Sequence, residues 1–85
     1  MSAHLRGHAR RVANRETEVY RARLAQNVRD ARLERGVAVS ELAAAAGLDK
    51  CNIHRIERGE RGWPDMLTLV RIARALDMQP SELMP

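Results

Sequence analysis

Apolar positions recur every three or four residues through most of the chain, which is the spacing of one face of an α-helix. A first helix is predicted from about Glu16 to Arg35, because Gly36 can adopt the positive φ that ends a helix. Its inward-facing positions are Tyr20, Leu24, Val28 and Ala31. No stretch alternates apolar and polar residues with a period of two, so no β-strand is predicted.

Four shorter helices are predicted after the first. Their approximate ranges are residues 39–46, 50–58, 65–76 and 82–84. Gly47 and Gly59 follow the first two of these helices and end them, whereas Asp49 and Ser81 are expected to cap the third and the last helix of the chain. The sequence therefore predicts an all-α bundle of five helices with short connections.

The second and third predicted helices form the most informative stretch. A helix of two turns, a turn at Gly47 and a helix that begins after Asp49 describe helix-turn-helix geometry. Ala43 falls where the two helices would cross, and only a small side chain fits there. The apolar anchors of the crossing are Leu42, Leu48, Ile53 and Ile56. The alternative, an ordinary helical hairpin, would tolerate larger residues at Ala43 and Gly47.

The net charge is concentrated at the N-terminus. Fifteen basic and eleven acidic residues give a charge of +4. Residues 1–15 hold four arginines and no acid, so they carry the whole surplus and residues 16–85 are neutral. We interpret residues 1–15 as a flexible basic arm and residues 16–85 as the helix-turn-helix domain. A solvated tail without a role is the alternative for residues 1–15.

Composition excludes several classes of protein. No run of about 18 apolar residues and no apolar signal segment are present, so neither membrane insertion nor secretion is expected. The single cysteine, Cys51, excludes an internal disulfide framework and fits a cytoplasmic location. The sequence has no glycine-rich phosphate loop, no paired carboxylates in an apolar setting and no nucleophile with an evident base. Neither enzymatic activity nor a cofactor is therefore expected.

One recurrent pattern runs from Leu24 to Met84. Its residues are Arg29, Arg32, Gly36, Glu41 to Ala43, Ala46 to Leu48, Ile53, Ile56 to Gly59, Pro64, Leu69 to Leu76, and Ser81 to Met84. The pattern resembles the Cro/phage-repressor (XRE) family of helix-turn-helix regulators. The resemblance implies the lambda-repressor-like fold and a homodimer that binds half-sites in double-stranded DNA of the nucleoid. Leu83 and Met84 would either form the dimer contact or cover the bundle's own core.

The family resemblance favours a transcriptional repressor, because a repressor acts by occupying a promoter whereas an activator needs a contact with polymerase. The alternative is an antitoxin-type module that neutralises a partner protein and binds DNA secondarily. A protein partner, toxin or polymerase, is not identified by the sequence.

Two residues depart from the family: Ala38 and Val39 replace a capping Ser or Thr and a Gln. The cap is therefore lost, unless Ser40 caps a shortened helix.

The resemblance also assigns the candidate DNA contacts. Lys50, Cys51 and Arg55 match base-reading positions, and Asn52 is added because Asn can pair with adenine. Arg55 is the first candidate for a guanine contact. The candidate phosphate contacts are Arg58 and Arg61 of the following loop and Arg10 and Arg11 of the arm. Arg32 and Glu57 match a pair that joins the first helix to the third through a structural ion pair.

Two interpretations of Cys51 stay open. It lies in the first turn of a helix beside Lys50, where the thiolate is favoured, so oxidation there could act as a switch. The alternative is a small residue that faces a thymine methyl group. Cys51 with His54, and His4 with His8, have metal-like spacing, but no carboxylate cluster accompanies either pair and no metal site is expected.

Overall fold

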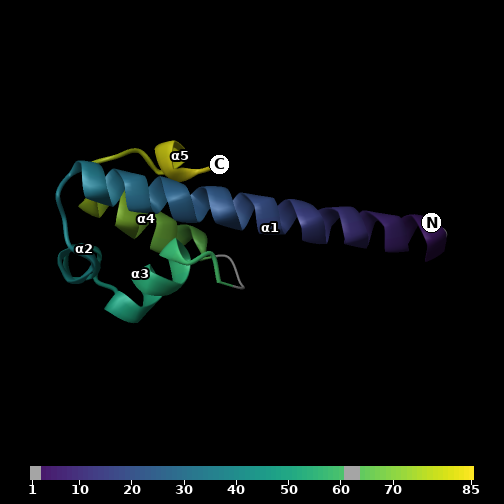
Figure 1. Ribbon diagram of the computed structural model, residues 1–85, viewed down its shortest axis with the longest axis horizontal. Coiled ribbons are helices and arrows are strands. Elements are labelled where there is room, and N and C mark those ends of the chain that lie inside the picture. The colour runs from purple at the N-terminus through teal and green to yellow at the C-terminus, as the bar shows by residue number, and fades with distance from the viewer. Residues whose placement is uncertain (1–2, 61–63) are drawn as a thin grey trace.

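The computed structural model describes residues 3–60 and 64–85, and side chains from residue 7 onward. Within this part the chain forms five helices and no strand, which confirms the predicted all-α fold. The helices are α1 (Ala3–Glu34), α2 (Val39–Ala46), α3 (Lys50–Glu57), α4 (Met66–Ala75) and α5 (Pro80–Leu83). Figure 1 shows α1 running the length of the molecule, with the other four helices gathered around its C-terminal half.

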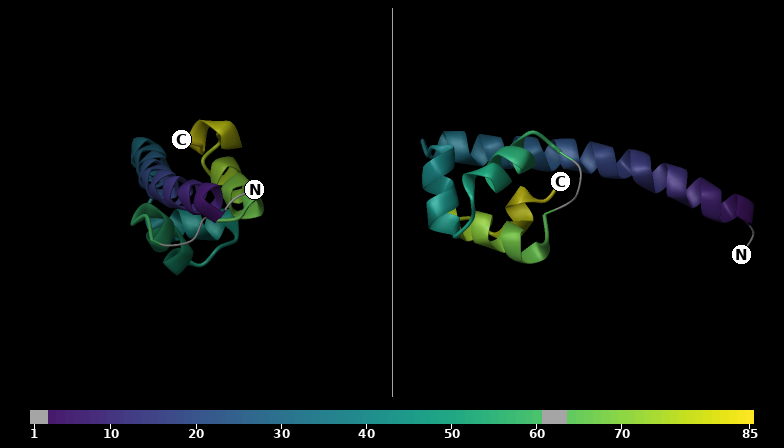
Figure 2. Two further views of the ribbon diagram at one scale, coloured as in Figure 1. Left: turned by 90° about the vertical axis from the view of Figure 1, so that its right-hand side faces the viewer. Right: turned by 90° about the horizontal axis from the view of Figure 1, so that it is seen from below.

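Helix α1 begins at Ala3, so the predicted start near Glu16 is wrong. The earlier residues continue the same helix beyond the bundle (Figures 1 and 2). Adding a residue to an existing helix is far easier than nucleating one, so the packed half supports the extension although Gly7 costs about 1 kcal/mol relative to Ala. The hydroxyl of Thr17 also donates to the carbonyl of Ala13 at 2.7 Å. A separate role for residues 1–15 stays a prediction.

The core fills the space between the C-terminal half of α1 and the other four helices. Its buried residues are Leu24, Val28, Ala31, Leu42, Ala43, Ile53, Leu69, Ile72, Ala73, Leu76 and Leu83. Tyr20, predicted on this face, is 40% exposed, whereas Leu24, one turn further along α1, is buried. Leu83 is fully buried, so this residue covers the core of its own chain.

Helix ends follow the predicted glycines but not all of the predicted caps. Gly47 has φ of 69°, which allows the sharp turn between α2 and α3. Asp49 occupies the N-cap position of α3 without a side-chain hydrogen bond. Helix α5 begins at Pro80, so Ser81 lies inside it and does not cap it. Proline suits this first position because its missing N–H has no partner there in any helix.

At the start of α2, a different hydrogen bond takes the place of the lost cap. Ala38 has no side chain that could accept a hydrogen bond, but its own N–H donates to the carboxylate of Glu41 at 3.0 Å. This is half of a capping box, and it satisfies one backbone donor. Ser40 lies inside α2, so the predicted alternative of a shortened helix is wrong.

Polar side chains of α1 tie it to the other helices. Arg32 donates to both carboxylate oxygens of Glu57, from Nε at 2.7 Å and from Nη2 at 2.9 Å. It also donates to the carbonyl of Val37 at 3.0 Å, and Arg29 donates to the backbone carbonyl of Glu57 at 3.2 Å. The hydrogen bond with the Glu57 carboxylate raises the pKa of Arg32 above its ordinary value. Arg32 therefore holds the end of α3 against α1.

The ion pair gives a first prediction. Glu57→Ala should lower the free energy of unfolding by about 1–3 kcal/mol, because it leaves the half-buried guanidinium of Arg32 without its carboxylate partner. Chemical denaturation monitored by circular dichroism measures this loss. Glu34→Ala is the control, since Glu34 is exposed and its carboxylate oxygen lies 3.8 Å from the nearest guanidinium nitrogen of Arg35. A Glu57→Ala protein that is no less stable than the control would refute the structural role of the pair.

The N-cap of α4 gives a second prediction. The carboxylate of Asp65 accepts a hydrogen bond from the N–H of Thr68 at 2.8 Å. The hydrogen bonds from Thr68 lower the pKa of Asp65. A carboxylate with a lowered pKa stabilises the fold above its unfolded pKa of about 3.9, and this stabilisation is lost as the pH falls through the folded pKa. Asp65→Ala should therefore lower the melting temperature near neutral pH and have little effect at about pH 2. Asp49→Ala, which removes no cap hydrogen bond, should show a weaker dependence on pH.

Candidate nucleic-acid interface

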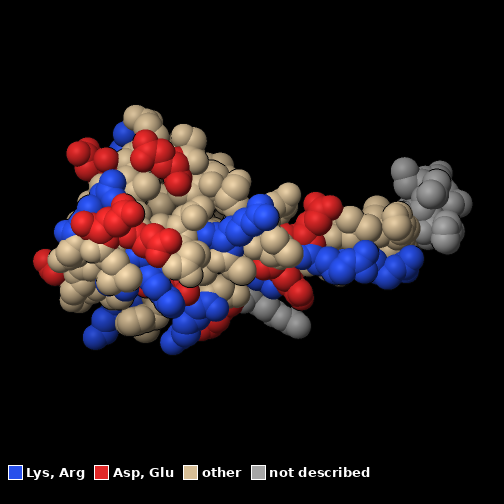
Figure 3. All heavy atoms as spheres, turned by 45° about the horizontal axis from the view of Figure 1, so that its top comes forward, with Lys and Arg blue, Asp and Glu red and all other residues tan. Residues whose placement is uncertain are grey.

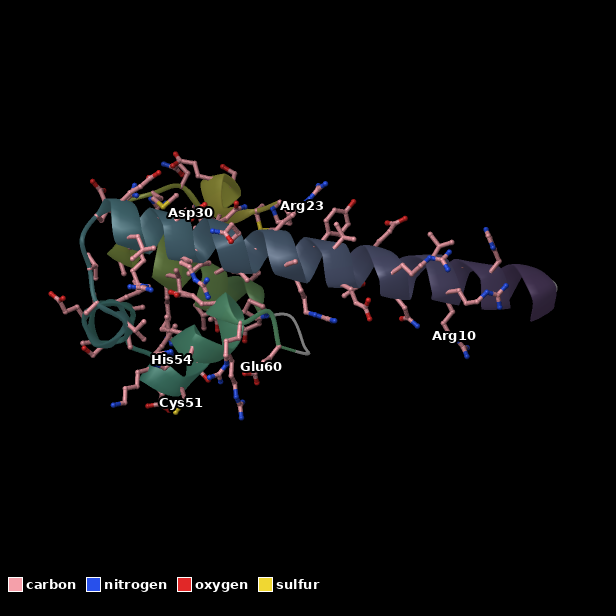
Figure 4. The ribbon with its side chains drawn as sticks, viewed as in Figure 1. Arg10, Arg23, Asp30, Cys51, His54 and Glu60 are labelled. Carbon is pink, nitrogen blue, oxygen red and sulfur yellow. The ribbon has the colours of Figure 1, made fainter. Side chains whose placement is uncertain are left out.

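Helix α3 has one face fixed to the bundle and one face open. Ile53 is fully buried, Ile56 packs against the core, and Glu57 is held by Arg32 at the end of the helix. The exposed residues are Lys50, Cys51, His54 and Arg55. Figure 4 shows Cys51 on the side of α3 that faces away from α1. The outer face therefore has a fixed orientation and is accessible along its length.

The four candidate base-reading residues are not equally accessible. Cys51 and Arg55 are four residues apart and so lie on the same face, with Lys50 beside them at the start of the helix. Asn52 is half-buried, which leaves less of its amide available to a ligand. Cys51 is an exposed free thiol. The structure thus brings Lys50, Cys51 and Arg55 together on one accessible surface.

The candidate phosphate contacts after α3 are described only in part. Arg58 follows α3 and is exposed, and its guanidinium forms an ion pair with Glu60 that is also exposed. Exposed pairs of this kind contribute about 0–1 kcal/mol, so Arg58 can exchange Glu60 for another anion. Arg61 lies outside the described residues.

Arg10 and Arg11 of the N-terminal extension lie on the same side of α1 as the bundle. Arg10 and Val28 are eighteen residues apart, as are Arg11 and Arg29, and eighteen residues make five turns of an α-helix. Arg10 thus lies in line with the buried face of α1. Arg11 lies in line with Arg29, which contacts the end of α3. Figure 4 shows Arg10 projecting to the side on which α3 lies. Figure 3 shows Lys and Arg side chains along one edge of the extension.

The contact of Arg29 with α3 is one that the sequence did not predict. Its guanidinium reaches the backbone carbonyl of Glu57 and lies 3.8 Å from the Glu57 carboxylate. The available signal was the spacing of Arg29 and Arg32, which are three residues apart and share one helix face. Arg29 and Arg32 thus both bind Glu57, the last residue of α3, from the same face of α1.

Among the described residues, no group of three or more His, Cys, Asp or Glu side chains is placed to hold a metal ion. No helix in this part of the chain is long and apolar enough to cross a membrane.

Comparison with curated proteins identifies relatives among bacterial regulators. The HTH-type transcriptional repressor RghR of Bacillus subtilis (strain 168) is 37% identical over 59 residues. The uncharacterised HTH-type transcriptional regulator RghRB of the same strain is 34% identical over 59 residues. Each match covers 69% of this chain but only 44% and 42% of the respective relative. The chain thus spans less than half the length of these relatives.

Solved structures share the fold over most of this chain. The restriction-modification controller protein C.AhdI of Aeromonas hydrophila is 31% identical with a TM-score of 0.72, and the match covers 75% of this chain and 96% of that one. The transcription factor NHTF of Neisseria, described as hypothetical, is 32% identical with a TM-score of 0.72, over 78% of this chain and 75% of that one. The family model described as helix-turn-helix matches residues 28–83. The chain therefore belongs to the helix-turn-helix family, of the Cro/phage-repressor (XRE) type that its sequence resembles.

Proposed function

We propose that this protein is a sequence-specific DNA-binding transcriptional regulator that acts as a repressor. The observation that carries the proposal is the open face of α3, which presents Lys50, Cys51 and Arg55 from a helix that is fixed to the bundle by its opposite face. The major groove of B-DNA admits an α-helix, and the second helix of a helix-turn-helix is the one that enters it.

The chemistry of this face suits DNA. Arg55 offers a planar guanidinium that can donate to both O6 and N7 of guanine, and Lys50 can donate to the same atoms. Cys51 presents a small side chain that can lie against a thymine methyl group. Arg58 and Arg61 would bind phosphates after α3, and Arg10 and Arg11 would add phosphate contacts from the extension.

The relatives support the regulatory role. RghR is named a transcriptional repressor and C.AhdI a controller protein, and neither name indicates a protein that neutralises a toxin. A short DNA-binding chain can repress by occupying a promoter. The protein would work in the cytoplasm on the nucleoid, as a homodimer on a site with two-fold symmetry, and without catalytic activity.

Arg55→Ala tests the role of α3. Sequences selected from a random duplex pool by the wild-type protein should bind the variant about tenfold to a hundredfold more weakly, because the guanine contact is lost. Fluorescence anisotropy at fixed salt measures the change. Arg74→Ala, on the exposed side of α4, is the matched control and should bind as the wild type does. If the wild-type chain binds no duplex even at low salt, the proposed function is wrong.

Arg10→Gln combined with Arg11→Gln tests the extension. Each lost phosphate contact should reduce the slope of log K against log salt by about 0.9, while the preferred sequence stays the same. Titrations of one duplex at several salt concentrations measure the slope. A changed sequence preference with an unchanged slope would contradict the assignment of these two arginines to phosphate.

A further inference from the structure

A hollow lies where the end of α3 meets the middle of α1. Its charged lining residues are Glu18 and Arg21 from α1, together with Glu57 and Arg58 at the end of α3. A Cβ atom added to Gly59, the next residue, would lie 3.9 Å from the carbonyl oxygen of Arg21. The backbone that follows α3 therefore packs directly against α1 at Arg21, and the hollow opens beside this contact.

Arg21 brings to the hollow a cation that no described acidic residue neutralises. Its side chain is half-buried, and its Nε is buried without a hydrogen-bond acceptor in the part of the chain that the structure describes. The ion pairs of that part join carboxylates to Arg29, Arg32, Arg35 and Arg58, and none includes Arg21. A guanidinium held in place with unused donors is suited to an anion from outside the chain.

Arg58 brings a second guanidinium to the same hollow. It is exposed and pairs with the exposed Glu60, which Figure 4 shows just after α3, and another anion can replace that carboxylate. Of the two acids in the lining, Glu57 is already bound by Arg32 at 2.7 Å, so Glu18 is the lining residue whose charge opposes an anion. Two arginines at one hollow favour a phosphate group, because the planar guanidinium donates pairs of hydrogen bonds to phosphate oxygens.

Arg21 lies on the side of α1 that faces α3. It is eleven residues from Arg32, which is close to three full turns, so both lie in one line along the helix. Arg32 contacts the end of α3. Arg10 lies another eleven residues toward the N-terminus, and Figure 4 shows it projecting to the side on which α3 lies. The three arginines thus form a row with intervals of about 16.5 Å, at 1.5 Å per residue.

We infer that Arg21 and Arg58 together bind one phosphate group of the DNA backbone at this hollow. The inference rests on the proposed function, in which α3 enters the major groove and a strand that borders the groove passes the end of α3. Arg58 exchanges Glu60 for the phosphate, and Arg21 donates to the same phosphate from α1. This contact joins the phosphate contacts that follow α3 to those of the N-terminal extension.

Salt titrations of one selected duplex, followed by fluorescence anisotropy, test the inference. Arg21→Gln should weaken binding by about threefold to tenfold without changing the preferred sequence, because it removes a phosphate contact and no base contact. Arg23→Gln is the matched control and should bind as the wild type does. It makes the same charge change two residues away, and Figure 4 shows Arg23 projecting from the side of α1 opposite to α3.

The variant that combines Arg21→Gln with Arg58→Gln tests whether the phosphate is shared. Its slope of log K against log salt should fall by about 0.9, the value for one phosphate, and not by about 1.8, the value for two. Arg21→Lys keeps the charge but loses the planar fork, so it should keep the wild-type slope and lose part of the affinity. A structural role of Arg21 alone would not separate slope from affinity in this way. Circular dichroism verifies that each variant is folded.

Three results would overturn the inference. If Arg21→Gln binds DNA no more weakly than Arg23→Gln, then Arg21 makes no phosphate contact, and the proposed function still holds. If the slope of the double variant falls by about 1.8, the two arginines bind separate phosphates. If the wild-type chain binds no duplex even at low salt, the inference and the proposed function fail together. Arg21→Lys decides the first question if Arg21→Gln proves unfolded, because affinity equal to that of the wild type would exclude the forked contact.

Discussion

The ion pair between Arg32 and Glu57 is the constraint on which the orientation of α3 depends. Glu57 is the last residue of α3 and is buried, so its carboxylate needs a fixed partner. Arg32 supplies two hydrogen bonds and also binds the carbonyl of Val37, next to the start of α2. One side chain of α1 thus contacts both the end of α3 and the segment that leads into α2. Ile53 alone would bury the inner face of α3 without setting where its end lies.

Helix α1 joins two regions with different physical demands. Its C-terminal half buries Leu24, Val28 and Ala31 and donates to carbonyl groups of other elements, including that of Leu83 from Asn27 at 2.9 Å. Its N-terminal half has no bundle to pack against and continues as a single helix. The surplus positive charge of the chain therefore lies on a helical extension. The domain that presents α3 is neutral, so the proposed recognition by its outer face would depend on individually placed side chains and not on bulk charge.

Local signals predicted much of the fold and of the candidate interface. The range of α2 and the positive φ of Gly36, Gly47 and Gly59 follow from short-range rules for helix ends. The burial of Ile53 and the exposure of Arg55 follow from helical spacing within eight residues. The caps were less predictable, because Asp49 and Ser81 occupy plausible positions while the hydrogen bonds depend on backbone geometry that neighbouring elements set.

The sequence by itself determined that the chain is all-helical, where α2 turns into α3, and which face of α3 is apolar, because each of these depends on residues close together in the chain. Only the tertiary structure decided that Tyr20 is exposed while Leu24 is buried, and that Arg29 joins Arg32 at the end of α3. Helical spacing identifies an apolar face but not how far other helices cover it. That coverage depends on segments distant in sequence, and it reaches Leu24 but not Tyr20, which lies one turn nearer the N-terminus.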